Sequence, residues 1–278
     1  MKKGISIWSF AETDLRKCME IAKDAGFDGV ELSLDEHGLV SMDSTKEDIM
    51  KVKEMADEVG IELYSVASGL YWTYNYTSAN EENVKRAKEI TKKQLQVASW
   101  LGCDTILVVP GAVEVAFDPG EVVEYDVAYD RALSALCELA PVAESLKVAI
   151  GVENVWNRFL LSPMEMAGFI DKVGSDYVGA YFDVGNVLFS GYPEHWIKIL
   201  NKRIKKVHFK DYRRAAGDLH GFVDILAGEV NWPGVMEKLE KVGYDGWVSA
   251  EMIPPYTHYP ETIVYNTSNA MDKILGRK

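Results

Sequence analysis

The sequence VAIGVENVWN (Val148–Asn157) decides the fold that we expect for this chain. It predicts a buried apolar strand that ends in a carboxylate, Glu153. An apolar layer offers that charge no partner, so the strand end must face water, a metal or a substrate. Three later apolar stretches carry a similar group: AYFDVGN reaches Asp183, KKVHFKD contains His208, and GWVSAEM reaches Glu251. Four buried strands that each deliver one ligand at a similar depth predict a metal site at one mouth of a barrel.

A repeated pattern of helix, glycine and apolar strand runs through the rest of the chain. Segments such as AKDAGFDGVEL and LEKVGYDGWVSAEM join an amphipathic helix to a strand through a glycine at the position that ends many helices. The glycines in this position are Gly26, Gly60, Gly102, Gly174 and Gly243. The two longest intervals between them have room for two units, and SLKVAIGVEN and NKRIKKVHFK supply the missing junctions, with a basic residue near the helix end.

This count gives eight strands, each followed by a helix, and it predicts an α/β fold: a (β/α)8 TIM barrel, single domain, over residues 1–278. The expected strands are Gly4–Trp8, Gly29–Leu34, Ile61–Ser68, Thr105–Pro110, Val148–Glu153, Val178–Asp183, Lys206–Phe209 and Trp247–Glu251. The expected helices lie near 14–25, 45–59, 80–101, 125–146, 163–173, 193–203, 232–242 and 260–275. A doubly wound open sheet is the alternative, but the chain lacks the glycine-rich first turn of a dinucleotide-binding protein.

Composition and charge narrow the class of protein. Apolar residues make up 47% of 278 residues, which is enough for a large core, and the net charge of −13 argues against nucleic acid as a partner. The three cysteines show no C-x-x-C spacing and are expected to be small buried side chains in a reducing compartment. The N-terminal MKKGISIWSF is not a signal peptide, and no apolar run approaches the ~20 residues that span a bilayer. We therefore expect a cytoplasmic protein without a membrane partner.

The four strand-end ligands favour a particular kind of metal. Neighbouring strands lie ~4.8 Å apart, so side chains from four consecutive strands can surround one cation. Three carboxylates and one imidazole suit Mn²⁺, Mg²⁺ or Co²⁺ better than a structural zinc, which prefers cysteine. Taken singly, a strand-end acid often caps a loop, and a single histidine is often a satisfied core residue. Their recurrence at the ends of four successive strands favours the metal site.

The motifs GVEN, YFDVGN, VHFKDYR and VSAEM resemble those of the xylose isomerase-like sugar isomerases and epimerases. The most similar branch is that of the D-tagatose/D-psicose 3-epimerases and the L-ribulose-5-phosphate 3-epimerases, and the resemblance runs from GISIW to the last strand. It implies that Glu153, Asp183, His208 and Glu251 hold one divalent metal ion, with Mn²⁺ favoured. It also implies that the two glutamates are catalytic, and that they move the C3 proton of a chelated ketose by way of an enediolate. A homo-dimer or homo-tetramer is the assembly that we expect.

Two positions depart from the free-ketose 3-epimerases. Asn186 stands three residues after Asp183, where those enzymes usually carry a histidine, and no second glutamate follows shortly after Glu153. An asparagine can bind a sugar hydroxyl but cannot relay a proton. The expected small-molecule substrate is therefore a sugar or a sugar phosphate. Arg214, six residues beyond His208, matches a substrate-binding arginine of these enzymes.

Basic residues gather after the seventh strand, at Lys210, Arg213 and Arg214. In many barrels the loops after strands seven and eight hold a phosphate, and arginine suits that role. The alternative is a solvated basic turn that pairs with Asp211 and Asp218. We expect Lys210 to contact the substrate, together with Arg214 and Asn186.

Other strand ends also supply candidates. Trp72, Tyr74 and Tyr76 follow the third strand and are expected either to cover a sugar ring or to line a dimer contact. Trp8 and Ser68 end the first and third strands, where we expect substrate contacts.

Glu31, at the end of the second strand, is expected to accept a hydrogen bond from the metal-bound His208 or to form a salt bridge in a loop.

Several functions use a metal site of this kind. Aldose–ketose isomerisation and dehydration of an inosose are alternatives to 3-epimerisation. A non-catalytic sugar binder would not need two opposed glutamates. An AP-type, phosphodiester-cleaving endonuclease would need several zinc ions and more histidines than the five present.

Overall fold

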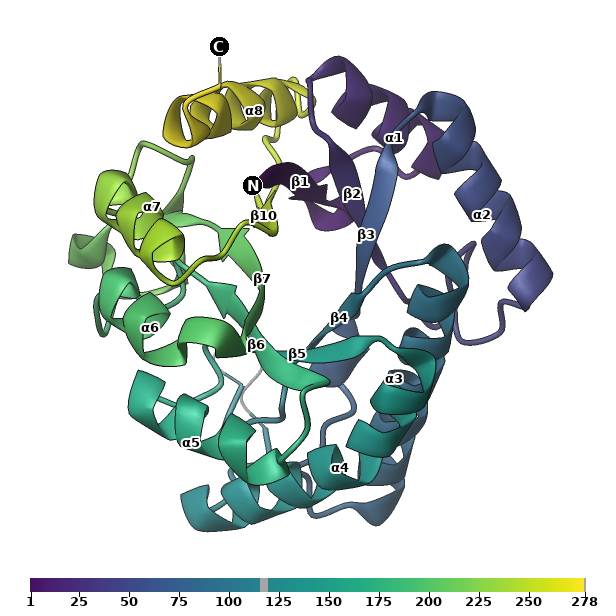
Figure 1. Ribbon diagram of the computed structural model, residues 1–278, viewed down its shortest axis with the longest axis vertical. Coiled ribbons are helices and arrows are strands. Elements are labelled where there is room, and N and C mark those ends of the chain that lie inside the picture. Colours follow the sequence, from purple (N-terminus) through teal and green to yellow (C-terminus); the bar gives the residue numbers. More distant parts are fainter. Residues whose placement is uncertain (116–119, 278) are drawn as a thin grey trace.

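Eight parallel strands close into a barrel, in the order β1-β10-β7-β6-β5-β4-β3-β2, and helices surround it (Figure 1). The structure is a computed structural model that describes residues 1–115 and 120–277. The barrel strands are β1 (Lys2–Ser6), β2 (Gly29–Ser33), β3 (Glu62–Ala67), β4 (Thr105–Val108), β5 (Ala149–Glu153), β6 (Val178–Asp183), β7 (Ile204–Phe209) and β10 (Trp247–Ala250). The α-helices are α1 (Leu15–Asp24), α2 (Lys46–Val59), α3 (Glu81–Leu101), α4 (Tyr125–Leu146), α5 (Pro163–Val173), α6 (Pro193–Leu200), α7 (Trp232–Lys241) and α8 (Thr262–Leu275). The predicted (β/α)8 barrel is confirmed.

The junctions from helix to strand are built as the repeat predicts. The five glycines of the pattern all have positive φ angles, between +73° and +85°: Gly26, Gly60, Gly102, Gly174 and Gly243. The two junctions without glycine use Lys147 at φ +56° and Asn201 at φ +50°. A positive φ is therefore kept at all seven positions, although only five of them carry glycine and Asn201, with ψ −125°, lies outside the left-handed helical region.

Some strand boundaries differ from the prediction. β1 ends at Ser6, and Trp8 lies in a 3-10 turn over Ile7–Ser9 instead of in the strand. β10 ends at Ala250, so Glu251 is the first residue of the following loop. The second strand is also shorter than predicted, and Glu31 sits in its middle, not at its end. These shifts arise because an apolar sequence continues past the last ladder hydrogen bond.

Side chains alternate between the helix-facing surface of the barrel and its interior. The interior is polar: the Tyr181 hydroxyl donates to Glu31 from across the barrel, and the Tyr64 hydroxyl donates to Ser249 at 2.7 Å. The Tyr64 ring stacks on Trp247 with ring centroids 4.0 Å apart. The apolar core fills the layer between the strands and the surrounding helices. Hydrogen-bonded side chains of the barrel interior therefore lie directly beneath the mouth at which the strands end.

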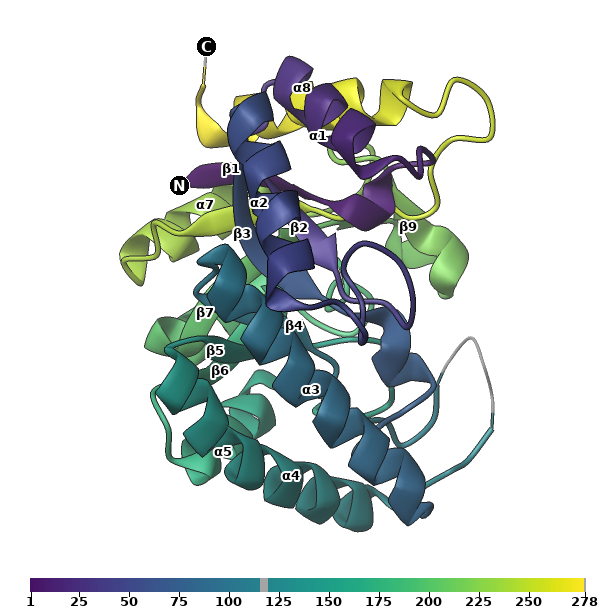
Figure 2. The same ribbon diagram turned by 90° about the vertical axis from the view of Figure 1, so that its right-hand side faces the viewer.

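A small hairpin that the sequence did not predict follows β7. Its strands, β8 (Asp211–Tyr212) and β9 (Phe222–Val223), pair in antiparallel fashion. Figure 2 shows the N-terminus on one side of the barrel and the long connection between β10 and α8 on the other, the side to which the strands run. Three segments after the last two barrel strands thus shape this mouth: the hairpin, the β10–α8 connection and α8.

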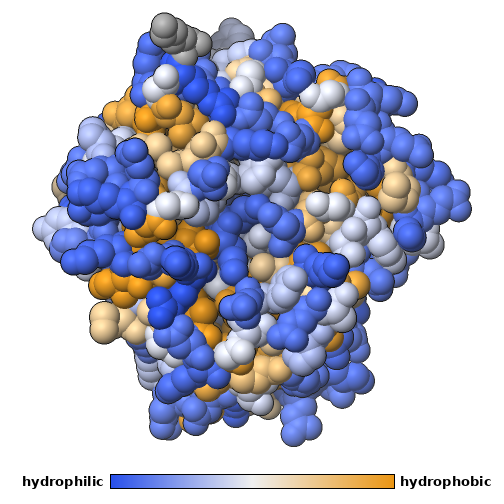
Figure 3. All heavy atoms as spheres, in the orientation of Figure 1, coloured by the Kyte–Doolittle hydropathy of each residue, from blue (hydrophilic) through white to orange (hydrophobic). Residues whose placement is uncertain are grey.

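Figure 3 shows that hydrophilic side chains dominate the face viewed in Figure 1, with hydrophobic side chains in separate small areas. Within the described residues, none of the helices combines the length and the apolar character that crossing a bilayer requires.

Candidate metal centre

Four side chains meet at the mouth of the barrel. Glu153, Asp183, His208 and Glu251, which we name the ligand cluster, each offer one ligand atom, and these atoms all lie within 4.8 Å of one another. His208 Nδ1 is 3.6 Å from Glu153 Oε1, 3.6 Å from Glu251 Oε2 and 3.9 Å from Asp183 Oδ2. The structure thus brings together the four residues that the sequence placed at strand ends. Within 1–115 and 120–277, no other group of His, Cys, Asp and Glu side chains has this geometry.

The barrel register explains the convergence. Glu153 and Asp183 are the last residues of β5 and β6, and Asp183 pairs with His208 on β7. Glu251 directly follows β10, which pairs with β7. Consecutive parallel strands end at the same rim, so the four side chains share one depth.

The ligand cluster fits a divalent cation. All four residues are at most 5% exposed. Among the described residues, six buried side-chain atoms lack a hydrogen-bond partner, and four of these are the cluster's own ligand atoms: Glu153 Oε1, Asp183 Oδ2, His208 Nδ1 and Glu251 Oε2. Lys210 Nζ offsets part of the cluster's negative charge through ion pairs with Glu251 Oε2 and Asp183 Oδ2, but three buried carboxylates exceed one ammonium group, and uncompensated buried charge costs several kcal/mol as an order of magnitude. Three oxygens and one nitrogen around one point satisfy a hard or borderline divalent cation.

His208 is oriented from behind by Glu31. Its Nε2 lies 3.0 Å from Glu31 Oε1, and both side chains are fully buried. The Tyr181 hydroxyl donates to the other carboxylate oxygen of Glu31. Because a carboxylate only accepts, the Nε2 position carries a hydrogen, and Nδ1 is the ring nitrogen whose lone pair a cation would take in place of a proton. Glu31 was expected either to contact His208 or to form a salt bridge in a loop, and the structure shows the contact with His208.

Asn154 positions the aspartate of the cluster, and the sequence analysis missed it. Its side chain accepts from the Asp183 backbone N–H at 2.9 Å and donates to the Asp183 carbonyl at 2.8 Å. The Asn186 backbone N–H donates to Asp183 Oδ1 at 2.7 Å. The nearby Gly185 lets Lys210 approach, since a Cβ at this position would lie 2.5 Å from the Lys210 Cβ. The available signal was the position of this asparagine directly after the strand-end Glu153, in GVEN, although nothing in the sequence named its partner.

Charges in the cluster are unequally distributed. Lys210 Nζ forms ion pairs with Glu251 and, at 3.3 Å, with Asp183. Burial raises the pKa of Glu153 to about 7, while burial also raises the pKa of Asp183. For Glu251, burial acts in the same direction but Lys210 and His208 outweigh it and lower the pKa to about 2. Burial alone would lower the pKa of His208, yet the surrounding carboxylates raise it well above its usual range. Protein groups alone thus leave Glu153 and Glu251 with opposite protonation preferences.

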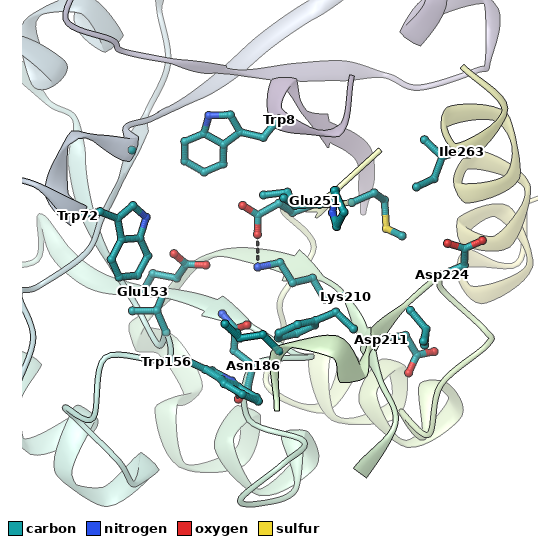
Figure 4. A pocket seen from close by; sticks show the side chains of 18 residues that line it. Trp8, Trp72, Glu153, Trp156, Asn186, Lys210, Asp211, Asp224, Glu251 and Ile263 are labelled. Atoms are coloured by element: carbon teal, nitrogen blue, oxygen red, sulfur yellow. Dashed lines mark hydrogen bonds and ion pairs between the residues drawn. The ribbon is translucent and has the colours of Figure 1, made fainter. Parts of the chain in front are cut away.

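A cavity of about 670 Å³ opens over the ligand cluster. Trp8, Trp72, Asn186 and Lys210 line it, with Glu153 and Glu251 at its floor (Figure 4). Of the expected substrate-contact residues, these are the ones that the structure places at the cavity.

Other expected contacts lie elsewhere. Ser68 is buried, and its hydroxyl donates to the Leu34 carbonyl at 2.7 Å and accepts from the Leu70 N–H, so it serves a turn. Tyr76 is also fully buried, against Thr91 in the core, and does not cover the cavity. Tyr74 packs partly buried against the core.

The basic residues after β7 diverge. Lys210 points into the ligand cluster, whereas Arg214 lies over the Tyr192 ring, 4.7 Å from its centroid, and donates to the Gly191 carbonyl at 3.2 Å. Arg213 donates to the Ala227 carbonyl at 3.0 Å. Neither arginine lines the cavity. Their expected pairing with Asp211 does not occur either, because Asp211 is buried and accepts from backbone N–H groups.

Comparison with known proteins agrees with this architecture. Residues 19–268 match the family described as xylose isomerase-like TIM barrel. A putative L-ribulose-5-phosphate 3-epimerase, SgbU of Escherichia coli (strain K12), is 27% identical over 247 residues, which cover 84% of this chain and 81% of SgbU. A D-psicose 3-epimerase solved in the presence of D-fructose has a TM-score of 0.80 at 17% identity and covers 99% of this chain and 100% of its own. The IolI protein, solved with a zinc atom, has a TM-score of 0.79 at 18% identity, with 99% and 98% covered.

These neighbours share the fold, and their names are largely those of sugar epimerases, consistent with an isomerase. The family match spans most of the chain and includes all four residues of the ligand cluster. This chain therefore belongs to the xylose isomerase-like TIM barrel family.

Proposed function

We propose that this protein is a divalent-metal-dependent sugar epimerase that inverts C3 of a ketose or ketose phosphate. The observation that carries the proposal is that two glutamates approach one point from opposite ends of an arc of strands (Figure 4). Glu153 ends β5 and Glu251 follows β10, with β6 and β7 between these strands. A sugar held between the two carboxylates can lose a proton on one face and regain one on the other, as inversion requires.

The ligand cluster would hold the cation. What a divalent cation supplies at such a site is polarisation of the ketose carbonyl, which makes the adjoining C–H group more acidic. The oxygen-rich donor set favours Mn²⁺, with Mg²⁺ or Co²⁺ as alternatives.

The two glutamates suit opposite roles. At any one moment epimerisation needs one carboxylate that accepts a proton and one carboxylic acid that donates a proton. In the absence of a cation, burial would raise the pKa of Glu251, but Lys210 and His208 outweigh it and lower the pKa to about 2, whereas burial raises that of Glu153 to about 7. The direction of the reaction decides which of them starts. Trp8, Asn186 and Lys210 would orient the sugar, since they line the cavity beside these carboxylates.

The test follows C3 of a ketose by NMR in D₂O with Mn²⁺-loaded protein. We expect Glu153→Gln and Glu251→Gln each to abolish epimerisation. Each variant should retain at most the exchange of the C3 hydrogen in one of the two epimers. The epimer that still exchanges should differ between the two variants. Glu54→Gln is the matched control, because it makes the same change at an exposed glutamate of α2 that does not line the cavity. Near-normal epimerisation by either glutamine variant would contradict the proposal.

The same spectra separate the alternative reactions. Formation of an aldose would indicate an aldose–ketose isomerase, and loss of water from an inosose would indicate a dehydratase. We further propose a cytoplasmic homo-dimer or homo-tetramer, which analytical ultracentrifugation of the metal-loaded protein tests.

A further inference from the structure

The cavity continues well beyond the ligand cluster. In Figure 4, Trp8 and Trp72 stand near Glu153 and Glu251, whereas Asp224 and Ile263 lie on the far side of Lys210. We name this far side the distal half. It is formed by residues 219–224 of the hairpin region, the start of the β10–α8 connection and α8. A total of about 670 Å³ lies well above the lower limit of roughly 300 Å³ for ligand cavities, so a single sugar ring leaves much of it free.

The distal half is mainly apolar, with two carboxylates beside it. The side chains that these segments contribute to it are mainly Leu219, Phe222, Val223, Met252, Ile253 and Ile263. Ile263 and Met252, 2% and 5% exposed, form the packed base of this apolar wall, whereas Ile253 is 50% exposed and offers most of its side chain for contact. Contact between such a surface and a hydrocarbon group removes apolar area from water, which favours binding. The surface offers few hydrogen-bond partners to sugar hydroxyls.

The cavity also lacks a cation for phosphate. Within the described part of the chain, Lys210 is the one basic residue of the lining, and it is committed to Glu251 and Asp183. The acidic residues Asp211 and Asp224 lie at the distal half (Figure 4). A phosphate there would face carboxylates without an arginine or lysine to offset them. The two arginines of the hairpin region bind backbone carbonyl groups outside the cavity.

From these observations we infer that the site takes an unphosphorylated ketose whose end remote from the reacting carbons carries an apolar substituent, such as an aromatic ether or glycoside. The inference rests on the proposed function for the orientation of the sugar, with its reacting carbons at the ligand cluster. The sugar then occupies the half beside Trp8 and Trp72, and the apolar substituent fills the distal half.

The test measures binding and chemistry separately, on the same Mn²⁺-loaded protein. Calorimetry gives dissociation constants for D-fructose, D-fructose 6-phosphate and 6-O-benzyl-D-fructose, and NMR in D₂O follows C3 exchange of each. Because one methylene group in a fitted apolar pocket changes discrimination by about 10- to 200-fold, we expect the benzyl ether to bind at least about tenfold more tightly than D-fructose. We expect the phosphate ester to bind more weakly than D-fructose.

Two substitutions at exposed positions probe the distal half. Ile253→Ser is expected to bring the affinity ratio of benzyl ether to D-fructose towards one. Leu219→Arg, at a side chain that is 38% exposed, is expected to raise the affinity for the phosphate ester. The control is Leu226→Arg, since Leu226 is 51% exposed in the same region but does not line the cavity, and it should change neither ratio.

Three results would overturn the inference: tighter binding of the phosphate ester than of D-fructose, equal binding of the benzyl ether and D-fructose, or no binding of any of the three. If the expected order of affinity is found without C3 exchange, the ligand class is supported and the 3-epimerase proposal fails. If exchange occurs but the phosphate ester is preferred, the epimerase proposal stands and this inference falls.

Discussion

Replacing Glu31 by glutamine is expected to weaken Mn²⁺ binding by about 10- to 100-fold, although Glu31 is not a member of the ligand cluster. Its carboxylate lies 3.0 Å from His208 Nε2 and is fully buried. A carboxylate can only accept, which keeps the imidazole hydrogen on Nε2. A glutamine amide can donate to Nε2 instead, and the imidazole hydrogen then moves to Nδ1, where it points at the carboxylates and competes with the cation.

The expected loss corresponds to about 1.4–2.7 kcal/mol, at 1.36 kcal/mol for each tenfold change. Competition between the metal-free protein and a fluorescent chelator measures it. Tyr181→Phe is the matched control, because it removes the other side-chain donor to Glu31 and leaves the contact with His208 in place. We expect that variant to stay within about threefold of wild type, since the carboxylate remains the acceptor.

Two outcomes would refute this reasoning. Unchanged Mn²⁺ affinity in Glu31→Gln would show that the tautomer of His208 does not depend on Glu31. An equal loss in Tyr181→Phe would show that packing in the barrel interior matters, and not the acceptor at Nε2.

Three further predictions follow from the same site. Burial raises the pKa of Glu153 to about 7, and the surrounding carboxylates, against the effect of burial, raise that of His208 above its usual range, so a cation must displace protons from both; Mn²⁺ affinity should therefore fall by at least about tenfold per pH unit below pH 7, and calorimetry that shows no dependence between about pH 5.5 and 7 would contradict this. Asn154→Ala removes both side-chain partners of the Asp183 backbone and should lower the unfolding free energy by about 2–4 kcal/mol, measured in urea against Leu226→Ala as the control. Mn²⁺ at about a hundredfold excess over its dissociation constant should add about 2.7 kcal/mol and raise the Tm by about 5–10 °C, an effect that a chelator reverses and that Asp183→Asn should diminish.

The sequence predicts the barrel and its rim well, because both follow from a repeated local pattern. Each of the seven helix-to-strand junctions has a residue with positive φ, and glycine marks five of them. Parallel strands in a closed barrel end at one rim, so a polar group at the end of an apolar strand can be placed without knowledge of any contact. The residues of the ligand cluster were found in this way.

Contacts across the barrel interior cannot be predicted by the same reasoning. Periodicity tells which face of a strand a side chain occupies, but not which distant strand stands opposite. Glu31 was therefore placed at a strand end, whereas it sits in the middle of β2 and meets His208 and Tyr181 from β7 and β6. Asn154 was missed for a related reason, since its partner on the neighbouring strand is backbone, and backbone leaves no mark in the sequence.

The hairpin after β7 shows why substrate preference is harder to predict than the ligand set. Lys210, Arg213 and Arg214 are close in sequence and looked like one phosphate site, yet only Lys210 enters the cavity. Between them, buried Asp211 accepts hydrogen bonds from Tyr212, Leu226, Val230 and Trp232, which fixes the fold of the hairpin region and turns the arginines outward. One buried carboxylate thus converts a run of positive charge into a surface feature and leaves apolar side chains to line the distal half. In this barrel the strands determine the ligand set, whereas the loops determine what surrounds the remote end of the sugar, and their folding depends on contacts that have no periodic signal.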